Sequence, residues 1–115
     1  MARRPHRIKG GSTITIVTYV AIHPNPGVQW DEVQKQLKTT CDLARKHGAE
    51  NVTVLATMVG GPATNTIGVL ATSEDWEKYG KAQQSLQGDP KFQEVMLAAG
   101  QIGTWETYVS QTIDL

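Results

Sequence analysis

Cysteine and histidine are scarce in this chain, and their scarcity limits its chemistry. Cys41 is the only cysteine, which excludes an intrachain disulfide and a multi-cysteine zinc site. The histidines stand apart at His6, His23 and His47, so the chain has no H-x-H or H-x-x-x-H spacing that would present two metal ligands together. We therefore expect neither a metal nor another cofactor.

Long apolar runs and a net charge are also missing. No run approaches the length that spans a membrane. Residues 13–22 are too rich in threonine for a secretory signal, and no small-x-small cleavage site follows them. The 11 basic and 11 acidic residues cancel, but four of the basic ones lie within residues 1–12. We expect a flexible basic arm there, an acidic domain over 13–115, no nucleic-acid or membrane partner, and a cytoplasmic location.

Three segments alternate between apolar and polar residues, as strands do. Residues 13–22 are β-branched and alternate, and residues 104–115 alternate again. Between them, residues 51–72 contain two such runs around Gly60-Gly61-Pro62, which predicts a hairpin. The chain should therefore contribute four strands.

Helical spacing fills the gaps between these strands. Residues 28–47 repeat apolar side chains at intervals of three and four. A second helix should start at a Thr72 or Ser73 cap and end at Gly88, and a short third helix should run from Asp89-Pro90 to Gly100. The order β-α-β-β-α-β, with an extra short helix before the last strand, predicts an α+β ferredoxin-like plait around a four-stranded antiparallel sheet.

The alternation also separates two faces of the predicted sheet. The face assigned to the helices is mainly apolar: Ile14, Ile16, Val20, Ile22, Val52, Val54, Ala56 and Met58, continued by Trp105, Val109 and Ile113. The other face mixes threonines with exposed apolar groups that a second copy of the chain would cover: Val17, Tyr19, Leu55, Thr57, Val59 and Tyr108. The alternative is a solvated, threonine-rich face on a monomer.

Local motifs strengthen this interpretation. Gly60-Gly61-Pro62 lies at the hairpin, Trp76-x-x-Tyr79-Gly80 opens the second helix, and Asp89-Pro90-Lys91-Phe92 opens the short one. With these motifs, residues 13–115 resemble the ferredoxin-like dimeric α/β-barrel superfamily, in particular its small antibiotic-biosynthesis-monooxygenase-like and NIPSNAP-like proteins. That superfamily includes cofactor-free monooxygenases, haem-degrading enzymes, cyclases and isomerases.

The resemblance implies a homodimer that packs sheet against sheet, with a pocket in each subunit between the sheet and its helices. The residues of this chain that map onto that pocket are Thr18, Trp30, Val54, Trp76, Tyr79, Phe92, Met96 and Trp105. The alternative is that these side chains form a filled core. The sequence is compatible with either arrangement.

Few residues are candidates for chemistry. His23 follows the first strand near the loop into helix 28–47, and histidine titrates near neutrality, which suits proton transfer. Tyr79 could orient a ligand through its hydroxyl. Cys41 lies on the apolar stripe of its helix and should be buried and inert. His47 lies at a charged helix end, where it could not serve as the axial ligand of a haem-degrading relative.

Three functions follow from these observations. The leading one is a homodimer that binds a small apolar molecule, aromatic or fatty, between sheet and helices. The second is a cofactor-independent monooxygenase or cyclase with a small aromatic or polyketide substrate. The third is a non-catalytic structural or regulatory dimer with a filled core.

Overall fold

The computed structural model describes residues 14–61 and 66–115. Its elements are β1 (Ile16–Pro24), α1 (Trp30–Lys46), β2 (Glu50–Ala56), β3 (Ile67–Ser73), α2 (Trp76–Gln87), α3 (Pro90–Ile102) and β4 (Gly103–Gln111). This order confirms the predicted β-α-β-β-α-β plait with an extra helix before the last strand. The expected arm at residues 1–12 and Pro62 of the expected turn lie outside the described residues.

The sheet has the strand order β2-β3-β1-β4, and every neighbouring pair is antiparallel. β1 and β3 are central, while β2 and β4 form the edges. Val20 of β1 lies opposite Val69 of β3 on one side and Thr107 of β4 on the other. Directly opposed residues share a face, so this register extends the faces of β1 across the sheet.

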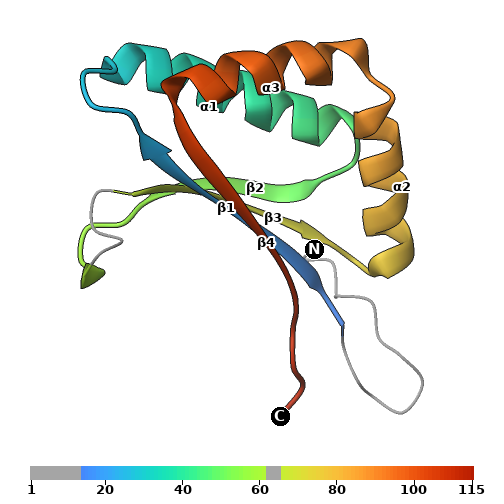
Figure 1. Cartoon of the computed structure of the whole chain (residues 1–115). Helices are drawn as coiled ribbons and strands as arrows, with labels where there is room; N and C mark the ends of the chain where they lie inside the picture. The colour runs from blue at the N-terminus through green and yellow to red at the C-terminus, as the bar shows by residue number, and fades with distance from the viewer. Residues whose placement is uncertain (1–13, 62–65) are drawn as a thin grey trace.

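All three helices lie on one face of the sheet (Figure 1). α1 and α3 run side by side above it, and α2 stands upright at one end, between the sheet and α3. The core between these layers is apolar and includes Ile22, Val33, Leu37, Val69 and Ile102. The assignment of Ile16, Val20 and Ile22 to the helix face is therefore correct.

The helix ends follow local chemistry. The Asp75 side chain accepts a hydrogen bond from the backbone N–H of Lys78 at 2.8 Å and caps α2, so the predicted cap at Thr72 or Ser73 is wrong. Asp89 caps α3 as predicted, by accepting from the N–H of Lys91 at 2.9 Å. The predicted stop at Gly100 is also wrong, because α3 continues to Ile102.

β1 differs from its prediction at both ends. It begins at Ile16 and continues through His23 and Pro24, which lie opposite Thr104 and Gly103 of β4. Its pairing with β3 stops at Ile22, so proline is tolerated at Pro24 because no β3 partner needs its missing N–H. The predicted end of this strand at residue 22 is therefore wrong.

Three residues expected on the helix face lie beyond the strands. Ile14 precedes β1 and is half-buried. Met58 follows the end of β2 and is 78% exposed, and Ile113 follows the end of β4 and is 81% exposed. Alternation predicts the face of a side chain only within a strand, so the placements of Met58 and Ile113 are corrected.

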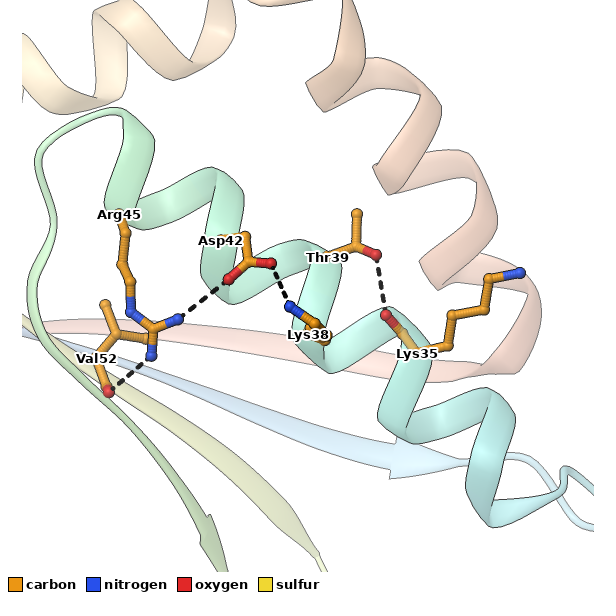
Figure 2. A network of polar contacts seen from close by, with 6 residues as sticks. All are labelled: Lys35, Lys38, Thr39, Asp42, Arg45 and Val52. Carbon is orange, nitrogen blue, oxygen red and sulfur yellow. Dashed lines mark hydrogen bonds and ion pairs between the residues drawn. The ribbon is translucent and has the colours of Figure 1, made fainter.

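A polar network ties α1 to the edge strand β2 (Figure 2). Lys38 and Arg45 both bond to Asp42, at 2.9 and 3.3 Å, and Arg45 also donates to the carbonyl oxygen of Val52 at 3.4 Å. The hydrogen bond from Lys38 is the largest cause that lowers the pKa of Asp42. Because these side chains are exposed, they orient the helix more than they stabilise it.

β1 and β4 approach closely at Gly103. A Cβ added there would lie 2.5 Å from the carbonyl oxygen of His23 and 2.9 Å from the Cα of Pro24. We expect Gly103→Ala to lower the free energy of unfolding by about 1–3 kcal/mol, because a backbone contact cannot yield as a side chain can. Urea denaturation followed by circular dichroism measures the change.

Gly80→Ala is the matched control, because a Cβ on Gly80, inside α2, would meet no atom within 4 Å. That variant should be as stable as the parent or more stable by about 0.5–1 kcal/mol, since alanine favours a helix. Equal stability of the Gly103→Ala and Gly80→Ala variants would contradict the close approach.

Candidate functional site

A cavity of about 450 Å³ lies between the sheet and the helices. Small side chains of the three strands β1, β3 and β4 form its floor: Thr18, Val20, Val69, Ala71, Ser73 and Thr107. α1 and α3 cover it, and α2 forms its end wall. A volume of this size lies in the lower half of the range of small-molecule sites.

Five residues that the sequence predicted for a pocket line this cavity together: Thr18, Tyr79, Phe92, Met96 and Trp105. They come from β1, α2, α3 and β4, so segments far apart in the chain meet there. The indole N–H of Trp105 donates to the carbonyl oxygen of Ala99 at 2.9 Å, which fixes the ring beneath α3. These five side chains therefore surround one cavity.

Trp30, Val54 and Trp76 do not line the cavity, and their predicted placement there is corrected. Trp30 is the first residue of α1 and is 55% exposed, because helical spacing alone does not show how far the covered part of a helix extends. Val54 lies opposite Val69, on the helix face as predicted, but on the edge strand, where it is 47% exposed.

Trp76 acts on the cavity through Tyr79. Its indole N–H donates to the side-chain oxygen of Gln111 at 2.7 Å, which fixes the start of α2 to β4. Its ring meets the Tyr79 ring edge to face, with centroids 5.7 Å apart. Trp76 is therefore a positioning residue for a side chain that lines the cavity.

The polar atoms of the cavity are uncharged. Six polar side chains line the cavity: Thr18, Thr40, Ser73, Tyr79, Gln83 and Thr107. Among the residues that the structure describes, no Asp, Glu, Lys, Arg or His lines it. The hydroxyl oxygen of Thr40 is buried and has no hydrogen-bond partner within the described part of the chain. A buried hydroxyl in that state is destabilising.

His23 and Tyr79, the two candidates for chemistry, are not brought together. His23 points to the face of the sheet away from the helices, where its Nε2 lies 2.8 Å from a carboxylate oxygen of Glu106. The Tyr108 hydroxyl donates to the other oxygen of Glu106 at 3.3 Å, and the charge of Glu106 raises the pKa of Tyr108. The polar cluster of His23 therefore cannot act on a molecule in the cavity.

The face of the sheet opposite the helices carries most of the predicted interface residues. Tyr19 lies opposite Tyr108 and Leu70, and a Cβ on Gly68 would come within 2.5 Å of the Tyr19 ring, so this ring covers Gly68. Val17 and Leu55 are on the same face by register. Thr57 and Val59 follow the end of β2, and Val59 is almost fully exposed.

A second polar cluster joins the three helices and escaped the sequence reasoning. His47, just after α1, lies 2.5 Å through Nδ1 from the Ser85 hydroxyl of α2 and 2.7 Å through Nε2 from Asp89, the cap of α3. Lys46 also reaches Asp89, at 3.2 Å. We call Ser85, His47 and Asp89 the helix clamp.

The helix clamp has the residue types of a nucleophilic triad, but its side chains connect the ends of three helices and do not face the cavity. Only 11% of the His47 and Asp89 side chains is exposed, and the second oxygen of Asp89 is occupied by the cap of α3. Ser85 is absent from the cavity lining. No sequence motif could have shown the cluster, because its members come from the ends of three different helices.

Cys41 is the last residue that the sequence singled out. It is 3% exposed on the apolar face of α1, and burial raises the pKa of its thiol, as expected for a structural cysteine.

Residues 14–61 and 66–115 contain no group of three or more His, Cys, Asp and Glu side chains that could hold a metal ion. No helix in those ranges is both long and apolar enough to cross a membrane.

Comparison with known proteins identifies the fold. A NIPSNAP family protein of unknown function from Agrobacterium tumefaciens superposes with a TM-score of 0.68 at 12% identity, over 85% of this chain and 87% of its own. A dimeric ferredoxin-like protein of unknown function from Thermobifida fusca gives a TM-score of 0.60 at 14% identity, over 93% and 97%.

An enzyme is also among the structural neighbours. SnoaB, a cofactor-independent oxygenase from Streptomyces nogalater, superposes with a TM-score of 0.61 at 17% identity, over 89% of this chain and 94% of its own. No family model and no curated protein matches the sequence. The structural neighbours confirm the ferredoxin-like fold that the sequence resemblance implied.

The helix clamp makes stability depend on pH. The hydrogen bond from His47, followed by that from the N–H of Lys91, lowers the pKa of Asp89 from 3.8 to about 2. Because the folded pKa lies below the unfolded one, the carboxylate stabilises the fold above about pH 4, and this contribution is lost as the pH falls from about 4 to 2.

We expect Asp89→Asn, which keeps a capping oxygen but removes the charge, to lower the thermal midpoint at pH 7 by roughly 5 °C. The difference from the parent should shrink below pH 4. Melting curves from pH 7 to pH 2 test this, with Asp114→Asn, beyond the end of β4, as the control for one lost carboxylate. A constant difference at every pH would contradict the role of the clamp.

Proposed function

We propose that the protein is a homodimer whose subunits each bind a small, mostly apolar molecule in the cavity between sheet and helices. The observation that carries this proposal is the cavity itself, about 450 Å³ in a chain of 115 residues. A well-packed core leaves few voids larger than a water molecule, so a space of this size needs an occupant or a function. A structural dimer with a filled core would lack it.

The enzymatic alternative, a cofactor-independent monooxygenase or cyclase, is supported by the likeness to SnoaB. That support is at the level of the fold, and one fold hosts many activities. In this chain such chemistry would depend on Tyr79 and its neutral neighbours, because His23 faces the other side of the sheet. Binding is therefore the function that the cavity favours.

The dimer rests on the uncovered face of the sheet. Tyr19, Leu55 and Tyr108 lie on it, with Leu55 and Tyr108 exposed in the single chain. Such a face would be covered by a second copy related by two-fold symmetry. A structural neighbour described as a dimeric ferredoxin-like protein supports self-association.

Ligand binding can be tested with N-phenyl-1-naphthylamine, an uncharged dye that fluoresces in apolar sites. We expect saturable binding by the parent protein and at least roughly tenfold weaker binding by Ala82→Phe, whose ring would occupy the cavity from its end wall. Gln84→Phe places the same ring on the exposed side of α2 and should bind like the parent. Equal binding by all three proteins would refute the site.

Dimerisation has its own test by light scattering. The parent should have twice the 12.6 kDa mass of one chain. Leu55→Arg should shift the mass towards one chain, because it buries an unpaired charge in the proposed interface. Leu97→Arg places the same charge on the exposed surface of α3 and should remain dimeric. A monomeric parent at micromolar concentration would refute the sheet-to-sheet dimer.

A further inference from the structure

Four of the six polar side chains that line the cavity lie towards one end. Ser73 lies opposite Ile16, at the start of β1, and Thr18 lies two residues further on the same face. Trp76 fixes the first turn of α2 over this end through Gln111, which is also opposite Ile16. Tyr79 and Gln83, one turn apart on α2, line the cavity from this end wall. We call Thr18, Ser73, Tyr79 and Gln83 the polar corner.

Two further polar side chains line the cavity outside this corner, namely Thr107, opposite Val20, and Thr40 of α1, whose hydroxyl oxygen is buried. Trp105, opposite Ile22 near the far end of β1, has its indole N–H satisfied by Ala99. Val95, Ala99 and Gly100 of α3 complete this region. A molecule in the cavity would therefore meet most of the hydrogen-bonding side chains at the α2 end and a mainly apolar surface elsewhere.

No counter-charge is available inside the cavity among the described residues. Charged groups on the elements around it have partners elsewhere, among them Glu74 with Lys78 at 3.0 Å and Asp89 with Lys46 at 3.2 Å. An ionised carboxylate or ammonium brought into such a site would lose its hydration without compensation. A hydroxyl or carbonyl group would lose little, because the polar corner replaces its bonds to water.

We propose that the cavity selects an uncharged ligand whose hydroxyl or carbonyl group lies against the polar corner and whose apolar body extends beneath α1 and α3. This inference rests on the proposed binding function and narrows its ligand class. It separates neutral phenols, alcohols and ketones from fatty acids, which carry a charged group of similar size. Gln83 is the residue best placed to reverse the selection, because it lines the cavity and a lysine there would supply the missing charge.

The test uses three compounds with one ring system: naphthalene, 2-naphthol and 2-naphthoate. Their affinities are measured at pH 7.5 by displacement of N-phenyl-1-naphthylamine. We expect 2-naphthol to bind the parent roughly tenfold or more tighter than 2-naphthoate, and a few-fold tighter than naphthalene. In Gln83→Lys the affinity for 2-naphthoate should rise roughly tenfold.

Gln84→Lys is the matched control, since it adds the same charge on the exposed side of α2 and should leave the order of affinities unchanged. If the dye binds but 2-naphthoate binds as tightly as 2-naphthol, the selection for an uncharged ligand is refuted while the binding function stands. If neither the dye nor any of the three compounds binds, both proposals are refuted.

Discussion

β1 is a central strand, paired with β3 on one side and with β4 on the other. Its side chains alternate between the two faces of the sheet. Its even-numbered residues from Ile16 to Ile22 face the helices, and its odd-numbered residues face away. A shift by one residue would exchange the two sets entirely. The register of β1 therefore fixes the core, the floor of the cavity and the uncovered face together.

The cavity exists because α2 does not lie flat on the sheet. α1 and α3 pack against each other and contribute buried residues to the core, while α2 contributes a wall and no fully buried residue. Polar contacts fix it at both ends, through Trp76 and Gln111 at the sheet and through Ser85 and His47 at the top. The floor has small residues, Ala71 and Ser73 among them, which leave the space between the sheet and the helices unfilled.

The sequence predicted what depends on local pattern and missed what depends on contacts between distant segments. The order of strands and helices, the Asp89 cap and the burial of Cys41 follow from periodicity and capping chemistry. The exposure of Trp30 and the continuation of β1 through Pro24 depend on how far neighbouring elements extend. The helix clamp joins positions 42 residues apart, and no local rule brings His47 to Asp89.

The contacts that anchor α2 also bear on how readily this helix opens. Because α2 is held at its two ends by polar contacts and has no fully buried side chain, we expect it to open more readily than the rest of the fold. None of the core residues Ile22, Val33 and Leu37 belongs to α2. If the proposed ligand occupies the cavity, we expect its residence time to depend on the contacts of α2 at Gln111 and His47, and its fit to depend on the shape of the floor.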